Sequence, residues 1–259
     1  MSMRAKQSLG QNFLMHQKTA DRIADAGALT ARDTVFEIGP GTGMLTRALL
    51  ERAGKVIALE ADHELIPVLM GQFAPEIKAK KLKLIEGDIR TFDLGTLPKG
   101  YGVVANIPYY VTGEIIRKLL SSKQKPSRVV LLVQKEVAVR VVRSKKESLL
   151  SLSVKIYGTA RYCFTVPRGA FKPAPKVDSA VLAISDIKAP FSTLKTEDAF
   201  FAILHAGFGH KRKRLAKNLE EVASKEKIAK AFTTLSLGEN SRAEDMPLAT
   251  WKSLVEALS

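Results

Sequence analysis

The sequence predicts an α/β protein in which a doubly wound, Rossmann-like sheet is followed by a small all-helical C-terminal domain. Two observations predict this class. Short apolar runs rich in β-branched residues alternate with helical patterns through the first two thirds of the chain, as in parallel sheets covered on both faces. From about residue 196 the strand-like runs stop, and only helical patterns continue.

Five strands are expected in the first half of the chain, because each run is apolar and most are closed by Gly, Asp or Asn. They are residues 35–38, 55–60, 82–86, 101–105 and 128–133. Two helices are expected between them, at residues 45–52 and 114–120. Residues 151–157 and 180–187 are expected to form two further strands.

The helical patterns near the C-terminus place a domain boundary close to residue 190. These patterns cover residues 198–208, 211–222, 228–235 and 249–258. The predicted domains are therefore residues 1–190, which contain the sheet, and residues 191–259, which are helical.

The charge of the chain indicates a polyanionic partner. It has 41 Lys and Arg residues against 26 Asp and Glu residues, a formal net charge of +15. Cations that neutralise phosphates release counterions, so a surplus of this size favours nucleic acid. Hydrophobic residues make up 46% of the chain, enough for a full core.

Several classes of protein are excluded. Cys163 is the only cysteine, so an internal disulfide and a Cys-based zinc site are ruled out. The four histidines show no ligand spacing, and no metal is expected. No apolar run approaches the roughly 20 residues that span a bilayer, and the polar N-terminus is unlike a secretory signal. We therefore expect a soluble, cytoplasmic monomer with no membrane partner.

A glycine-rich turn after the first strand predicts a nucleotide cofactor. Gly39, Gly41 and Gly43 stand between a strand and a helix, where glycine permits positive φ and close approach of a ligand. Met44 stands where the dinucleotide fingerprint requires glycine, which favours a smaller adenosyl ligand. Glycines at such a turn also serve packing alone, so the motif requires support from other residues.

Acidic residues near the strand ends supply that support. Glu60 can accept hydrogen bonds from ribose hydroxyls, and Asp88 can accept from an adenine amino group while Ile89 packs on the ring. Glu37 is expected to orient the glycine turn. This order of acids around the turn predicts S-adenosylmethionine (SAM) as cofactor, and hence the sheet of a SAM-dependent methyltransferase.

The segment after the fourth strand predicts a site for the amino group of adenine. The Asn106 side chain and the Ile107 carbonyl can accept from both N–H groups, which stabilises the charge that develops on the nitrogen. Pro108 would fix the backbone, and Tyr109 would stack on the base, worth about 1–3 kcal/mol. Phe171 is the candidate for the other face of the base, although an ordinary proline-rich connection fits it nearly as well.

With these motifs the chain closely resembles the ribosomal RNA adenine N6-dimethyltransferases of the KsgA/RsmA type, a superfamily that also includes the Erm methyltransferases. The matching segments are residues 7–14, the glycine turn, Glu60, Asp88, Asn106 to Tyr109, and residues 134–138, 171–181 and 211–215. The resemblance implies that Gln11, Asn12 and Leu14 help to close the cofactor pocket, which Asn106 also borders.

The resemblance further implies the substrate. The product would be N6,N6-dimethyladenosine, made on two adjacent adenosines near the 3′ end of small-subunit (16S) ribosomal RNA, late in assembly of the pre-30S subunit. Residues 1–190 would then be catalytic and residues 191–259 would bind RNA. Two places depart from the family pattern: Tyr110 stands where asparagine is frequent, and residues 145–148 lack the usual glycine- and asparagine-containing loop.

Two groups of cations are candidate RNA contacts. Lys211, Arg212, Lys213 and Arg214 form a compact cluster that suggests a phosphate footprint, although a solvated helix face would look the same. Arg4 and Lys6 on the N-terminal arm are as consistent with RNA contact as with solvent.

Other functions remain open at this point. One is an Erm-like enzyme that methylates 23S ribosomal RNA and confers macrolide resistance, and another is a non-catalytic ribosome assembly factor that keeps the fold. An NAD-linked dehydrogenase is remote, because Met44 breaks the fingerprint and no histidine is placed to relay a hydride.

Overall fold

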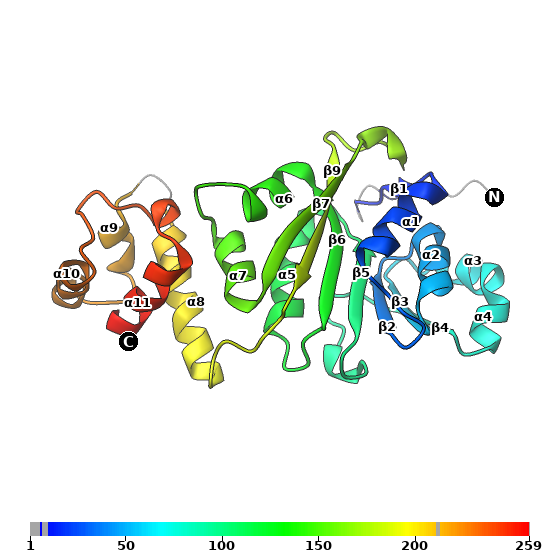
Figure 1. Ribbon diagram of the computed structural model, residues 1–259, viewed down its shortest axis with the longest axis horizontal. Coiled ribbons are helices and arrows are strands. Elements are labelled where there is room, and N and C mark those ends of the chain that lie inside the picture. The colour runs from blue at the N-terminus through cyan, green and yellow to red at the C-terminus, as the bar shows by residue number, and fades with distance from the viewer. Residues whose placement is uncertain (1–5, 7–9, 211–212, 259) are drawn as a thin grey trace. The chain divides into compact units, whose positions relative to one another are not determined.

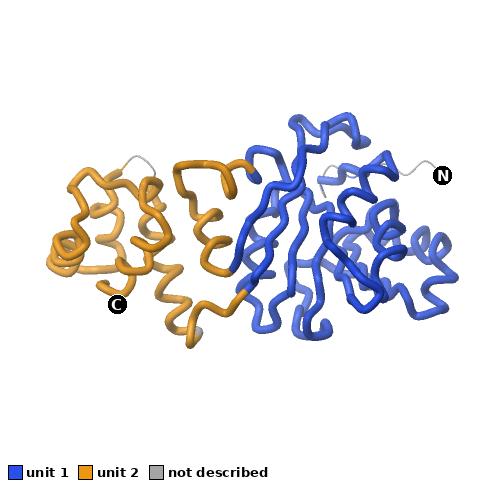
Figure 2. The backbone as a smooth tube through the Cα atoms, in the orientation of Figure 1, with its two compact units in different colours: residues 1–138, 158–187 blue, residues 139–157, 188–259 orange. Residues whose placement is uncertain are grey.

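The computed structural model describes residue 6 and residues 10–210 and 213–258. They pack as two compact units, which Figure 2 colours separately. The first contains residues 1–138 and 158–187, and the second contains residues 139–157 and 188–259. The second unit thus takes in residues 139–157, which the sequence analysis assigned to the first domain.

The first unit is built on one sheet that, over the described residues, has seven strands (Figure 1). In chain order they are β2 (Thr34–Ile38), β3 (Lys55–Glu60), β4 (Leu82–Glu86), β5 (Gly102–Asn106), β6 (Arg128–Gln134), β7 (Thr159–Val166) and β9 (Ser179–Ser185). Their order across the sheet is β4-β3-β2-β5-β6-β9-β7. The five neighbouring strands β4, β3, β2, β5 and β6 are parallel to one another. Strand β9 is antiparallel to both of its neighbours, β6 and β7. The five expected parallel strands are confirmed within one residue at each end.

Helices cover both faces of this sheet, as the doubly wound prediction requires. They are α1 (Gln17–Ala26), α2 (Met44–Arg52), α3 (Leu65–Gln72), α4 (Ala74–Lys78), α5 (Thr112–Ser121) and the start of α6 (Lys135–Val142). The chain moves outward in one direction from β2 to β3 and in the other from β5 to β6. Right-handed crossovers therefore place α2 and α5 on opposite faces. Ile23 of α1 and Leu49 of α2 share one buried cluster with Val104 of β5.

A separate two-stranded sheet links the N-terminal arm to a later segment. Strand β1 (Phe13–Leu14) pairs antiparallel with β8 (Phe171–Lys172), so that Leu14 lies opposite Phe171. Short 3-10 turns η2 (Leu94–Thr96), η3 (Tyr109–Val111) and η4 (Arg168–Ala170) connect other elements of this unit.

The regular secondary structure of the second unit is all helical over its described residues. It contains α7 (Leu149–Tyr157), α8 (Leu194–Phe208), α9 (Leu215–Leu219), α10 (Lys225–Thr234), the turn η5 (Ala243–Asp245) and α11 (Leu248–Leu258). Trp251 is fully buried and stacks on Phe208 with 5.6 Å between ring centroids. Helices are confirmed in all four C-terminal segments, although α9 is shorter than expected. In the part of the chain that the structure describes, every helix is too short or too polar to cross a membrane.

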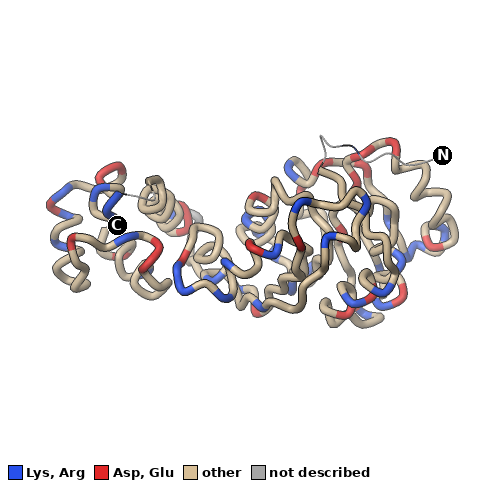
Figure 3. Tube along the Cα trace, turned by 90° about the horizontal axis from the view of Figure 1, so that it is seen from above, with Lys and Arg blue, Asp and Glu red and all other residues tan. Residues whose placement is uncertain are grey.

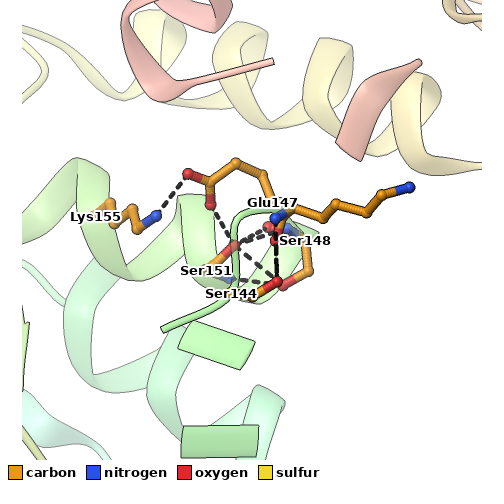
Figure 4. Close-up of polar contacts among 6 residues, drawn as sticks. Ser144, Glu147, Ser148, Ser151 and Lys155 are labelled. Carbon is orange, nitrogen blue, oxygen red and sulfur yellow. Dashed lines mark hydrogen bonds and ion pairs between the residues drawn. The ribbon is translucent and has the colours of Figure 1, made fainter. Parts of the chain in front are cut away.

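The strand expected at residues 151–157 is wrong, because this segment forms helix α7. Its side chains are buried all round, so the burial carries no helical period that the sequence could reveal. The missed signal is a reciprocal cap: Ser148 Oγ accepts from the Ser151 amide at 3.1 Å, and Ser151 Oγ accepts from the Ser148 amide at 2.7 Å. Figure 4 shows this cap beside Glu147, whose carboxylate accepts from Ser151 and Lys155.

The loop before α7, which departs from the family pattern, is fixed within the second unit. The Glu147 amide donates to the Glu244 carbonyl at 2.6 Å, and Lys146 forms an ion pair with the Glu244 carboxylate. Ser144 Oγ accepts from the Lys146 amide at 3.1 Å. These bonds tie residues 144–148 to η5, which explains why they pack with the C-terminal helices.

Candidate active site

The site lies where four parallel strands end at one edge of the sheet. Strands β2, β3, β4 and β5 run in the same direction, so their carboxyl ends lie together. A cavity of about 1050 Å³, part of it open solvent, lies along this edge. Its lining includes most of the predicted site residues: Gln11, Asn12, Leu14, Gly39, Gly41, Glu60, Asp88, Ile89, Asn106, Ile107, Pro108 and Tyr109. The topology thus brings together segments far apart in sequence.

The glycine turn leaves space on the cavity side. Gly39 has φ +69°, and a Cβ placed there would meet only the Asn106 carbonyl oxygen, at 3.9 Å. The positive φ calls for glycine here, and the open space beside it would let a ligand approach the backbone. Gly43, which is not among the lining residues, is different, because a Cβ there would lie 2.5 Å from the Phe73 ring. Gly39 therefore fits a small bound ligand, and Gly43 is required for packing.

Glu60 holds the glycine turn while facing the cavity. Its Oε2 accepts from the Gly41 amide at 3.0 Å, and its Oε1 accepts from the Asp62 amide at 2.9 Å. Burial raises the pKa of Glu60, and these backbone bonds act in the opposite direction. Each oxygen has a further lone pair, so the carboxylate can also accept from the hydroxyls of a ribose.

Glu37 lies behind the turn and is not among the residues that line the cavity. It is 1% exposed, and its Oε2 accepts from the Thr46 hydroxyl at 2.7 Å, while its Oε1 has no hydrogen-bond partner among the described residues. Burial raises the pKa of Glu37 to about 8. The residue therefore joins the end of β2 to helix α2 and reaches the cavity only through the turn between them.

Asp88 lines the cavity in an ion pair with Arg90. The guanidinium contacts both carboxylate oxygens. Nε lies 3.1 Å from Oδ1 and 2.9 Å from Oδ2, and Nη2 lies 2.5 Å from Oδ2. The Arg90 hydrogen bonds lower the pKa of Asp88. Asp88 is therefore an ionised acceptor at neutral pH, as a role opposite an amino group requires.

The Asn106 amide has a defined orientation. Its Nδ2 donates to the Asn12 carbonyl at 3.0 Å. Because a backbone carbonyl can only accept, the donor end of the amide faces the N-terminal arm. The acceptor Oδ1 is thereby left for the cavity, where the Ile107 and Pro108 backbone continues the wall.

The two aromatic candidates for the base lie in different environments. Tyr109 is half-buried, and its hydroxyl hydrogen-bonds the Ser179 hydroxyl, which fixes the ring at the cavity. Burial raises its pKa, so the hydroxyl stays protonated. Phe171 is 4% exposed in the core cluster with Leu14 and is not among the lining residues. The structure thus places Tyr109 at the site and Phe171 behind it, and the role expected for Phe171 stays a prediction.

An acid that the sequence analysis missed anchors the N-terminal arm. Asp62, 3% exposed, accepts from Lys6 Nζ at 2.8 Å and from Gln11 Nε2 at 2.9 Å. Burial opposes its ionisation, but these bonds outweigh the burial and lower the pKa of Asp62. Lys6, which the sequence left open between RNA contact and solvent, lies in this ion pair and in another with Glu64 at 3.0 Å. The only available signal was an acid two positions after Glu60.

The remaining basic candidates are partly described. Arg4, Lys211 and Arg212 lie outside the described residues. Lys213 and Arg214 are exposed just before α9, at the rim of a surface hollow within the helical unit. Figure 3 shows Lys and Arg mixed with Asp and Glu along the trace of the described chain. Among the residues that the structure describes, no cluster of His, Cys, Asp or Glu is suited to hold a metal.

Comparisons with known proteins agree with this geometry. A family model for ribosomal RNA adenine dimethylases matches residues 2–259. A protein of Dehalococcoides mccartyi named ribosomal RNA small subunit methyltransferase A is 37% identical, over 98% of this chain and 88% of its own length. The structure of a dimethyladenosine transferase from Plasmodium falciparum has a TM-score of 0.78 at 27% identity, covering 93% of this chain and 95% of that one. The 23S rRNA methyltransferase ErmE has a TM-score of 0.74 at 24% identity, covering 95% and 99%, which is a likeness of fold.

Proposed function

This chain belongs to the ribosomal RNA adenine dimethylase family, and we propose that it dimethylates N6 of two adjacent adenosines near the 3′ end of small-subunit ribosomal RNA. Its cofactor is SAM, which supplies a methyl group on an electrophilic sulfonium. The name of the Dehalococcoides mccartyi relative supports the small subunit as the source of the RNA. The single observation that carries the proposal is that Asn106 and the Gly39 turn face one cavity.

We propose that the Asn106 and Tyr109 side chains receive the base. The Asn106 donor is bonded to Asn12, so its oxygen is the atom free to accept from an exocyclic amine. Tyr109, held by Ser179, offers a fixed ring for stacking. Together they would hold the amine in one orientation and stabilise the positive charge that develops on it. Methyl transfer in this site needs no strong general base, because the amine can lose its proton after the methyl group has been transferred.

The cofactor is proposed to lie against the strand ends. Gly39 and Gly41 would allow it close to the backbone, Glu60 would accept from its ribose, and Asp88 would accept from its adenine amine with Ile89 on the ring. Gln11, Asn12 and Leu14 would close the arm over it, with Asp62 as their anchor.

The helical residues 191–259 are proposed to position the RNA. Lys213 and Arg214 are exposed together, and the chain carries a net charge of +15. Such contacts bind phosphates without reading sequence. We further propose that the protein acts as a monomer, without a metal, in the cytoplasm.

The test is methyl transfer from tritiated SAM to small ribosomal subunits that lack the modification. We expect label in dimethyladenosine, which mass spectrometry of the RNA would locate at two adjacent positions. Unmethylated large subunits serve as the matched control substrate. Label in large-subunit RNA alone, or none in either subunit, would refute the proposed substrate.

A further inference from the structure

A second tyrosine at the mouth of the cavity has no role in the chemistry described so far. Tyr110 follows Tyr109 directly and lines the same cavity, yet it is 63% exposed. A tyrosine ring has a flat apolar face and a polar hydroxyl, so it can stack on a ligand while it stays in contact with water. Because Tyr110 is both exposed and part of the cavity lining, its ring is available to a ligand bound there.

The Tyr110 ring packs against Gly10 of the N-terminal arm. Gly10 has φ +61°, and a Cβ placed there would lie 2.9 Å from Tyr110 Cε1. Any larger residue at position 10 would collide with the ring, so the arm and the ring are in direct contact. The ring is thus held against a glycine turn while most of its surface remains open to solvent.

The charges around this rim balance one another. Arg90 pairs with Asp88, and its other charged neighbours include Glu114, while Lys118 donates to the Arg90 carbonyl at 2.8 Å. These two cations are matched by two acids, so these four described residues offer no surplus charge to a phosphate. What the rim offers to a ligand is therefore the aromatic face of Tyr110.

We propose that Tyr110 is a second stacking surface, which holds the nucleotide adjacent to the target adenosine. This inference rests on the proposed function, because it assumes that the cavity receives an adenine from single-stranded RNA. Tyr109 and Tyr110 line the same cavity, so a nucleotide next to an adenosine bound at Tyr109 would lie beside the Tyr110 ring. Stacking accepts any base, since every base has a π face.

The experiment compares three variants with the wild-type enzyme. Y110A removes the ring, Y110F keeps the ring without the hydroxyl, and M70A removes a comparably exposed side chain (53%) from α3, away from the cavity lining. For each we would measure the SAM dissociation constant by calorimetry. We would also measure kcat and KM with unmethylated small subunits at two salt concentrations.

We expect Y110A to raise KM for the subunit by about fivefold or more, the effect of losing one stacked base. Its SAM dissociation constant should be unchanged, and Y110F and M70A should behave like the wild type. The ratio of KM values between Y110A and wild type should be the same at both salt concentrations, because no phosphate contact is lost.

Three results would overturn the inference. KM equal in Y110A and wild type would leave the ring without a role in RNA binding. A weaker SAM affinity with unchanged KM would assign the ring to the cofactor instead. An equal rise in M70A would show a general surface effect. A wild-type enzyme that methylates no subunit would instead refute the proposed function itself.

Discussion

Replacing Glu37 by glutamine should abolish a pH dependence of stability that the wild-type protein carries. Burial raises the pKa of this carboxyl to about 8, against 4.5 for the unperturbed group. Thr46 satisfies only one of its oxygens, so ionisation would leave a buried charge that is poorly compensated. Glutamine has nearly the same shape and keeps an oxygen for Thr46, but it cannot ionise.

The direction in which stability changes with pH follows from proton binding to Glu37. Between pH 4.5 and about 8 the folded protein keeps a proton on Glu37 that the unfolded chain has lost, so stability falls as pH rises. The contribution is fully present below pH 4.5 and is lost once the pH passes about 8. The folded pKa of about 8 lies about two pH units above pH 6, and each unit corresponds to about 1.36 kcal/mol. The contribution of Glu37 to the free energy of unfolding should therefore fall by roughly 2.7 kcal/mol over this range.

Urea unfolding at several values between pH 6 and pH 9 measures this difference. The free energy of unfolding of the wild type should fall across this range by roughly 2.7 kcal/mol more than that of E37Q. E51Q is the matched control, because it removes one exposed carboxylate from helix α2, and it should follow the wild type. Parallel curves for wild type and E37Q would refute the assignment of a buried, protonated Glu37.

Three further predictions concern the site. N106A should lower kcat by about a hundredfold or more while changing RNA affinity little, since its bond to the amine strengthens in the transition state; equal turnover in single-turnover assays would contradict this. G39A should weaken SAM binding by about tenfold, because φ +69° disfavours a side chain, and calorimetry with unchanged affinity would count against the turn as the cofactor site. The double variant K213A/R214A should weaken RNA binding and reduce the slope of log affinity against log salt by roughly 1–2, and an unchanged slope would assign both cations to solvent.

The strand ends of the site were predictable because the buried strands of a parallel sheet leave a recognisable pattern in the sequence. Strands covered on both faces read as unbroken apolar runs, so the polar residue that follows each run marks its carboxyl end. Glu60 and Asn106 were found in this way, and Asp88 just beyond β4 in the same manner. The topology then brings their side chains to one cavity without further information from the sequence.

Helix α7 and strand β7 escaped prediction for opposite reasons. Helix α7 is buried on every side, so its apolar residues follow no helical period. Strand β7 lies at the edge of the sheet, where most of its residues are only partly buried and a bulge interrupts the pairing between Tyr162 and Phe164. Its sequence therefore lacks the apolar run that identified the central strands.

The parts of the site that depend on the N-terminal arm could not be inferred from local sequence at all. Asn12 lies 94 positions from Asn106, and Lys6 lies 56 positions from Asp62; no spacing rule connects them. The arm nevertheless reaches two of the residues that were predicted to contact the base. The Asn12 carbonyl orients the Asn106 amide, and two residues later Leu14 pairs with Phe171 and holds it in the core.

One consequence is that a displacement of the arm would act on both groups at once. If β1 separated from β8, Asn106 would lose the bond that defines its orientation, and Phe171 would lose the neighbour that buries it. The ion pair of Lys6 with Asp62, two positions after Glu60, fixes the other end of the arm. Because Glu60 also holds the glycine turn, the cofactor side and the base side of the cavity are joined by one short segment of chain.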